Sequence, residues 1–128
     1  MSSLSDTFRS GVEAGDLDRM TAALAPGVVF NSPVAFRPFE GRDTVGQVLG
    51  AVMETFEDFR YTDELEGPTA HALVFEARVA DKQVQGIDLL RFDSEGKISD
   101  FTVLVRPLSG TVALAQAMGP KVAHLKGG

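Results

Sequence analysis

The chain has 128 residues, of which 44% are hydrophobic and 23% are charged, and it contains no cysteine. This composition is typical of a folded globular domain and excludes disulfides, a cysteine nucleophile and a cysteine-based metal site. The net charge of −6 argues against nucleic acid as a partner, because phosphate contacts need clustered lysine and arginine.

The chain also carries no pattern that directs it to a membrane or out of the cell. Its start lacks the basic and apolar stretches of a signal peptide, and no apolar run approaches the roughly 20 residues that cross a bilayer. We therefore expect a cytoplasmic protein without a membrane partner, formed by one domain over residues 1–128 with a loose tail over about 119–128.

Two short helices are expected at the start of the chain. Apolar residues at helical spacing favour a first helix that stops at Gly15, and Asp16 suits the N-cap of a second helix that ends before Pro26. A brief apolar strand covers residues 28–30. The prolines and glycine of residues 31–41 then forbid regular structure.

A third helix is expected after this loop. It begins near Asp43 or Thr44, and apolar residues at intervals of three and four continue to Phe56. From Asp58 onward the hydrophobic period changes to two, which indicates strands. The odd-numbered residues of the segment His71–Val79 share one face of such a strand.

Two turns and a final helix complete the expected order of elements. Turns at residues 81–82 and 93–96 connect strands of an antiparallel meander that ends near residue 106. The final helix covers roughly 108–118, where Gly119–Pro120 ends it. Helices followed by a long antiparallel sheet define an α+β layout, in which the helices cover one face of the sheet.

The order of elements and several local motifs resemble the nuclear-transport-factor-2-like superfamily, in particular its SnoaL-like and ketosteroid-isomerase-like branches. The motifs are Gly15-Asp16-Leu17-Asp18, Leu24-Ala25-Pro26 with Val28-Val29-Phe30, Phe39-Glu40-Gly41-Arg42-Asp43 and Gly96-Lys97-Ile98. The resemblance implies a cystatin-like cone, in which a strongly curved antiparallel sheet covered by N-terminal helices encloses a pocket. It does not imply one activity, because the superfamily includes isomerases, cyclases, dehydratases, epoxide hydrolases and noncatalytic binding domains.

Asp88 is the strongest candidate for chemistry. It shares a strand face with Leu90 and Phe92, which are expected to point inward. A carboxyl group among apolar side chains has its charged form disfavoured, so its pKa rises and it can act as a general acid or base near neutral pH. Its position also resembles that of the acid/base aspartate of SnoaL-like polyketide cyclases. The alternatives are a structural bond to a backbone amide or Arg106, or a solvent-facing position if the register slips by one residue.

Asn31 and His71 are candidates for assisting roles. Asn31 resembles the pocket asparagine of limonene-epoxide-hydrolase-like members and could orient a substrate oxygen, although asparagine before Ser-Pro is also a common turn residue. His71 shares a face with Leu73 and Phe75 and could pair with Asp88 as a proton carrier, although histidine at a strand end is often structural. With two histidines and no ligand spacing, no metal and no cofactor are expected.

Large apolar side chains are candidates for the wall of the pocket, and each of them could also be ordinary core. They are Phe8, Phe30, Met53, Phe56, Phe59, Phe75, Leu90, Phe101 and Val103. We expect a cavity of several hundred Å³ between the third helix and the strand Leu73–Val79, with its mouth near Asn31 and the loop Pro33–Glu40.

The catalytic sets of the resembling branches are incomplete in this chain. Tyr61, the single tyrosine, falls on an expected strand and does not match the helix-borne tyrosine of the ketosteroid isomerases. Phe101-Thr102 replaces the His-Trp pair of the polyketide cyclases, and Val103 stands where the last aspartate of the epoxide hydrolase triad aligns.

Three functions follow from these patterns. The first is a binding domain for a small hydrophobic molecule, and the second is a cofactor-independent isomerase, cyclase or dehydratase-type lyase in which Asp88 moves a proton next to a carbonyl. The third is a dimeric protein-interaction module. The strand Gly86–Phe92 is apolar on both faces, so we also expect a homodimer that covers the face turned away from the helices.

Overall fold

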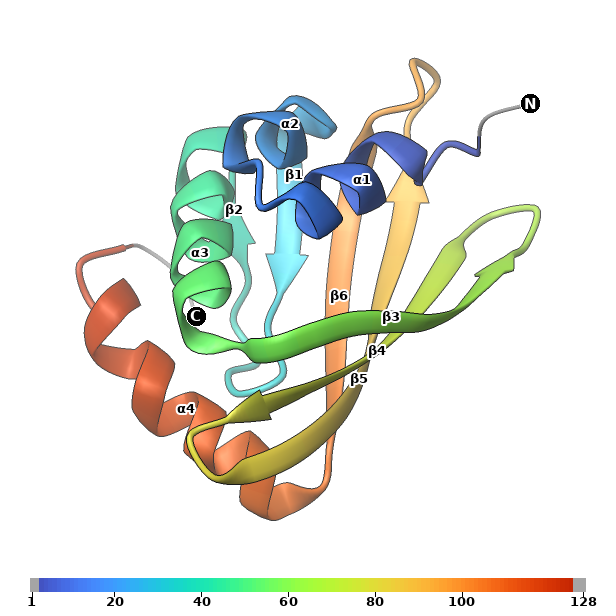
Figure 1. The fold of residues 1–128 in the computed structure, drawn as a ribbon. Coiled ribbons are helices and arrows are strands. Elements are labelled where there is room, and N and C mark those ends of the chain that lie inside the picture. The colour runs from blue at the N-terminus through green and yellow to red at the C-terminus, as the bar shows by residue number, and fades with distance from the viewer. Residues whose placement is uncertain (1–2, 126–128) are drawn as a thin grey trace.

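A computed structural model describes residues 3–125 of the chain (Figure 1). The elements in chain order are α1 (Asp6–Ala14), α2 (Leu17–Ala22), β1 (Leu24–Asn31), β2 (Phe39–Glu40), α3 (Arg42–Thr55), β3 (Glu57–Glu66), β4 (His71–Val79), β5 (Lys82–Phe92), β6 (Ile98–Arg106) and α4 (Leu108–Val122). The α+β class is confirmed. None of the helices in the described part of the chain has the length and apolar character needed to cross a membrane.

The strands form one six-stranded sheet in the order β2-β1-β6-β5-β4-β3. The segment from β3 to β6 is the expected antiparallel meander. The sheet as a whole is mixed, because β1 runs parallel to β6. The expectation of a wholly antiparallel sheet was therefore wrong. Between β1 and β6 the chain passes through β2, α3, β3, β4 and β5. This long connection allows β1 and β6 to lie side by side and to run in the same direction.

Local chemistry sets the boundary between α1 and α2 as predicted. Gly15 adopts the left-handed conformation at φ 66°, and the side chain of Asp16 accepts a hydrogen bond from the Arg19 backbone N–H at 3.1 Å. The second helix ends at Ala22 and not at Pro26, which instead lies within β1. This strand tolerates the proline because its pairing with β6 is interrupted by a bulge that includes Pro26.

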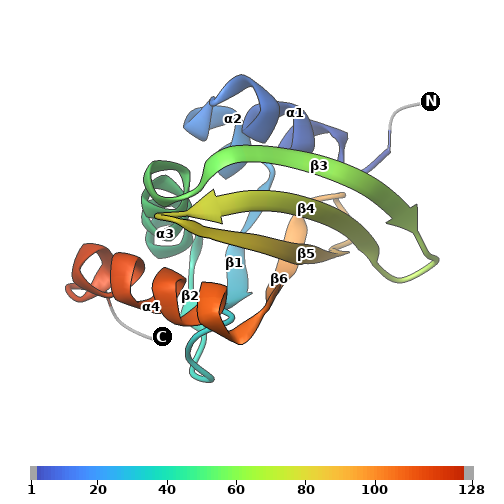
Figure 2. The same ribbon diagram turned by 60° about the horizontal axis from the view of Figure 1, so that its bottom comes forward.

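The sheet curves strongly around the helices, as Figure 2 shows for β3, β4 and β5. Register shifts interrupt β3 twice, between Glu57 and Arg60 and between Tyr61 and Asp63. Such bulges bend a strand and increase its twist. The concave face of β4 carries the predicted odd-numbered residues from His71 to Val79, all of which are buried. A cone results, with α1, α2, α3 and α4 at its concave side (Figures 1 and 2).

The final helix is longer than the sequence predicted. α4 continues through Gly119 and Pro120 to Val122, so the expected loose tail was wrong for residues 119–122, while residues 126–128 lie outside the described part. Gly119 has no Cβ to clash with the following proline ring, which makes a helical conformation before proline less costly. The apolar side chains of Met118 and Val122 pack against the core and hold this last turn in place.

Candidate functional site

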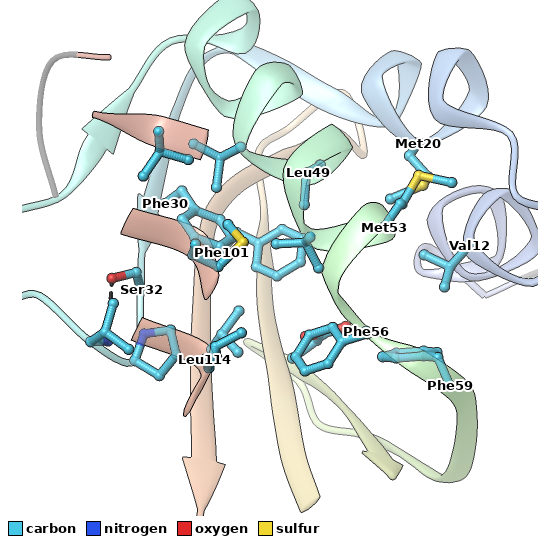
Figure 3. A pocket seen from close by; sticks show the side chains of 18 of the residues that line it. Val12, Met20, Phe30, Ser32, Leu49, Met53, Phe56, Phe59, Phe101 and Leu114 are labelled. Carbon is cyan, nitrogen blue, oxygen red and sulfur yellow. Dashed lines mark hydrogen bonds between the residues drawn. The ribbon is translucent and has the colours of Figure 1, made fainter. Parts of the chain in front are cut away.

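A cavity of about 580 Å³ lies between α3, α4 and the concave face of the sheet. This volume falls in the range of small-molecule sites. The wall is mostly apolar and is contributed by α1, α3, α4, the long strands and the loop before β2. Figure 3 shows the labelled side chains turned toward one space, with Ser32 and Phe59 on opposite sides of it.

The predicted wall residues are placed as expected, with one exception. Phe8, Phe30, Met53, Phe56, Phe59, Phe75, Phe101 and Val103 all line the cavity. Leu90 does not line the cavity; it lies opposite His71 at the end of β4, and neither of these two residues belongs to the wall. The wall also includes Leu114 and Met118 of α4, which sequence reasoning missed, because the position at which this helix docks leaves no local pattern.

Asp88 reaches the cavity from the middle of β5. It pairs with Leu73 of β4 and Val103 of β6, and its side chain points to the concave face as strand parity predicted. The residue is 7% exposed. A buried carboxyl group therefore lies in a wall that is built mostly from apolar side chains.

The partner of Asp88 is Tyr61, whose hydroxyl donates a hydrogen bond to Asp88 Oδ2 at 2.8 Å. Arg106 is not the partner, because its guanidinium donates to Gln85 Oε1 on the outer face of the sheet. Within residues 3–125, no completely buried side-chain oxygen lacks a hydrogen-bond partner. The second carboxyl oxygen of Asp88 has no hydrogen-bond partner among the described residues, so it is not completely buried. It faces the cavity, where it is available to a bound molecule.

Burial sets the proton affinity of this pair. It raises the pKa of Asp88 to about 7, against the opposing effect of the hydrogen bond from Tyr61. Burial also raises the pKa of Tyr61 well above its ordinary value, and the neighbouring charge of Asp88 adds to that shift. At neutral pH the carboxyl is consequently present in both protonation states, while the phenol keeps its proton and remains a donor.

Stacked aromatic rings build the apolar surroundings of Asp88 and Tyr61. The Phe59 ring meets Tyr61 edge to face with centroids 5.0 Å apart, and it stacks on Phe75 at 4.8 Å. Gly86, opposite Phe75 in the register, makes this arrangement possible, since a Cβ there would lie 2.3 Å from Phe75 Cζ. A glycine in the middle of an apolar strand is the sequence signal for such close approach.

The predicted assisting residues do not join this site. Asn31 does not line the cavity; its amide donates to Thr102 Oγ1 at 2.9 Å and to Asp100 at 3.5 Å, on the outer face of the sheet. The residue next to it, Phe30, takes the inward position, so the alternation of β1 turns Asn31 away. The neighbouring loop does contribute to the wall, through Ser32 and residues 33–35.

His71 is buried on the concave face but lies beyond the cavity wall. Its Nδ1 is 3.1 Å from Ser5 Oγ and 3.3 Å from Ser3 Oγ, and among the described residues no hydrogen bond joins it to Asp88. The expected His71–Asp88 proton relay is therefore not formed. The reason is one of register, since His71 lies opposite Leu90 and a different residue, Leu73, faces Asp88.

One group of possible metal ligands lies near His71. Donor atoms of Glu64, Glu66 and His71 lie within 4.8 Å of one another. However, Arg9 Nη1 donates to Glu64 Oε1 at 2.8 Å, and Ser5 Oγ donates to the other oxygen of Glu64 at 3.1 Å. The guanidinium already neutralises this carboxylate, and its charge opposes the approach of a second cation.

The curved sheet, the helices on its concave side and the enclosed apolar cavity define the nuclear-transport-factor-2-like, or cystatin-like, class of α+β proteins. The family profile of the SnoaL-like domain matches residues 6–101, and the chain belongs to this family. No match was found among the curated proteins.

Solved structures agree with this assignment. An uncharacterized bacterial protein with a cystatin-like fold from Silicibacter pomeroyi is 33% identical with a TM-score of 0.90, covering 96% of this chain and 87% of its own. A steroid delta-isomerase from Pseudomonas aeruginosa is 35% identical with a TM-score of 0.88, covering 97% and 95%. An NTF2-like protein of unknown function from Cytophaga hutchinsonii, 16% identical with a TM-score of 0.65, covers 81% and 88% and shows the shared fold.

Proposed function

We propose that this protein binds a hydrophobic small molecule with a carbonyl group and transfers a proton beside that carbonyl, with Asp88 as acid and base. The observation that carries the proposal is the carboxyl of Asp88 in an apolar cavity wall, with one oxygen held by Tyr61 and the other open to the cavity. The cavity favours a small-molecule function over a protein-interaction module, which would not require one.

The chemistry needs no cofactor. The ionised Asp88 takes a proton from the carbon next to the carbonyl, and the C–H electron pair moves into the enolate. The carboxylic acid then returns a proton to the same or another carbon, which exchanges or isomerises the molecule with no net change in atoms. A pKa of about 7 suits both steps, because the group is then a sufficient base and a sufficient acid at neutral pH.

The comparison with the Pseudomonas aeruginosa protein supports the class of substrate. That protein is named a steroid delta-isomerase, and the two chains align over almost their whole lengths. A steroid is a rigid, apolar molecule of the kind that a largely apolar cavity of about 580 Å³ can hold. We extend to this chain the class of molecule, a hydrophobic ketone, and not a particular steroid.

Proton exchange in D₂O tests the proposal without knowledge of the natural substrate. The protein is mixed with a series of apolar cyclic ketones and steroid ketones, and loss of the α-proton signal is followed by NMR. Asp88→Asn keeps the shape and removes the titrating proton, so exchange is expected to fall by roughly 10² to 10⁴. Asp100→Asn, on the outer face of β6, is the matched control and should exchange like wild type.

The alternative is a binding domain without turnover. It is favoured by one observation: Glu13 and Arg60, the other charged residues of the wall within residues 3–125, have exposed side chains, so none of the described residues places a second buried charge in the wall beside Asp88. Binding of the same ketones, measured by calorimetry, with α-proton exchange that does not exceed the rate without protein, would establish this alternative. Exchange that is equal in wild type and Asp88→Asn would reject the catalytic role of Asp88.

A further inference from the structure

Arg9 of α1 lies over the ring of Tyr61, the residue that donates a hydrogen bond to Asp88. The centre of its guanidinium is 5.4 Å from the centroid of the Tyr61 ring, within the range of a cation–π contact. Arg9 Nη1 donates to Glu64 Oε1 at 2.8 Å, and Arg9 Nε donates to Glu13 Oε2 at 3.3 Å. The guanidinium is therefore anchored at two nitrogens while it covers the tyrosine ring.

The anchor and the ring belong to the same strand. Glu64 is three residues beyond Tyr61 on β3, so Arg9 of α1 contacts this strand at two places, the Glu64 carboxylate and the Tyr61 ring. Phe59 contacts the Tyr61 ring edge to face at 5.0 Å. Tyr61 is thus held by an aromatic neighbour on its own strand and by a cation from a helix, and its hydroxyl is directed at Asp88.

We propose that Arg9 is a positioning residue of this site, which, anchored by Glu64, keeps Tyr61 where its hydroxyl donates to Asp88. Its effect on turnover rests on the proposed function, whereas its effect on Tyr61 and Asp88 does not. The position of Arg9 explains why an arginine suits this site: a planar guanidinium stacks its flat face on a ring while its in-plane N–H groups bind carboxylates, and an ammonium group has no such face.

The charges around the pair agree with this role. The positive charge of Arg9 lowers the pKa of Tyr61, while burial, Asp88 and Glu13 raise it. A phenol beside a cation is a better hydrogen-bond donor. The hydrogen bond from Tyr61 in turn lowers the pKa of Asp88 against the effect of burial. Loss of Arg9 should therefore raise the pKa of Asp88.

Two spectroscopic measurements test the proposal without a substrate. Tyr61 is the single tyrosine and the chain has no tryptophan, so the tyrosine band of the near-ultraviolet circular dichroism spectrum reports this residue alone. The ionisation of Asp88 is followed by NMR of ¹³C-labelled aspartate, with the signal assigned by its loss in Asp88→Asn. Both are measured in wild type, Arg9→Met, Arg9→Lys and a control variant.

Arg78→Met is the control. Arg78 also pairs with two carboxylates, Glu57 at 2.6 Å and Asp58, and its side chain is 35% exposed against 31% for Arg9. It does not line the cavity. A general effect of removing an arginine that is paired with two carboxylates should therefore appear equally in both variants.

In Arg9→Met we expect a weaker tyrosine band, a higher pKa of Asp88 and an α-proton exchange rate constant, kcat, about tenfold lower with little change in KM. Arg9→Lys keeps the charge and should be intermediate, and Arg78→Met should match wild type. A folded Arg9→Met with an unchanged tyrosine band and an unchanged Asp88 titration would overturn the proposal.

A second variant covers the case in which Arg9→Met does not fold. Glu64→Gln weakens the anchor of Arg9 and keeps a side chain of the same size, so it should shift the Asp88 titration in the same direction by a smaller amount. An unchanged titration in Glu64→Gln would then reject the role of Arg9. If wild type exchanges no ketone, the proposed function fails, while the two spectroscopic measurements still decide the role of Arg9.

Discussion

Asp88 makes folding depend on pH, because its carboxyl lies in an apolar wall with one hydrogen-bonding partner. Burial raises its pKa from the ordinary value of 3.8 to about 7. Between these values the folded protein holds a proton that the unfolded chain releases. The corresponding stability is fully present below the lower value and is lost as the pH rises to the higher one.

Asp88→Asn should therefore become more stable relative to wild type as the pH rises through this window. Across the whole window the gain is on the order of 4–5 kcal/mol, at about 1.4 kcal/mol for each unit of pKa. Urea unfolding of both proteins at about pH 5 and about pH 8 measures the difference. Asp63→Asn, an exposed carboxyl on β3, is the control. An Asp88→Asn difference that is the same at both pH values would contradict the buried, titrating carboxyl.

Among the elements, β5 shapes the cavity through a residue that has no side chain. Side chains alternate between the two faces of β5, so Gly86, two residues before Asp88, also lies on the concave face. There it lies opposite Phe75 and in close contact with the Phe75 ring. An added Cβ would also lie 2.7 Å from the backbone oxygen of Leu104, which cannot move without disturbing the β5–β6 pairing. The ring would have to shift into the cavity.

Gly86→Ala should therefore destabilise the protein by about 1–3 kcal/mol, as overpacked cores do, and weaken the binding of any ketone that wild type binds. Gly27→Ala in β1 is the matched control, because a Cβ there meets nothing within 4 Å, and its effect should stay within about 0.5 kcal/mol. The two free energies of unfolding are measured by urea titration. Equal values would show that the Phe75 ring does not lie as close to Gly86 as described.

α4 closes the cavity by the same kind of close approach. At Gly110 a Cβ would lie 2.3 Å from Val84 Cγ1, so the helix backbone lies directly on β5. This contact at the start of the helix places Leu114 and Met118 over the cavity. The part of the wall that α4 contributes therefore depends on one small residue at its first turn.

At the scale of the whole molecule, the convex face of the sheet carries a continuous apolar row. Val74, Ile87 and Leu104 lie side by side across β4, β5 and β6, and Leu104 is 53% exposed. Leu89 extends the row on β5. We propose that a second copy of the chain covers this face in an isologous homodimer, because both partners then bury the same apolar row.

Light scattering at micromolar concentration tests the homodimer. Wild type should have the mass of two chains, and Ile87→Lys, which places a charge in the middle of the row, should have the mass of one. Asp81→Lys, in the turn between β4 and β5, introduces the same side chain away from the row and should remain a dimer. A monomeric wild type would reject the interface.

Short-range patterns in the sequence suffice for the local elements and for the direction of Asp88. A glycine stop and an aspartate cap separate α1 from α2, and an alternation of period two turns Asp88 inward beside Leu90. These features depend on residues that are neighbours along the chain. For that reason the sequence alone could predict them.

The partners of Asp88 depend on tertiary structure. Tyr61 lies on β3, which β4 separates from β5, so its contact with Asp88 depends on two registers and on the bulges that curve the sheet. Arg9 reaches Tyr61 from a helix 52 positions earlier in the chain. The alternation of side chains along one strand cannot predict these contacts. The curvature of the sheet and the register of its strands decide which side chains meet across the concave face.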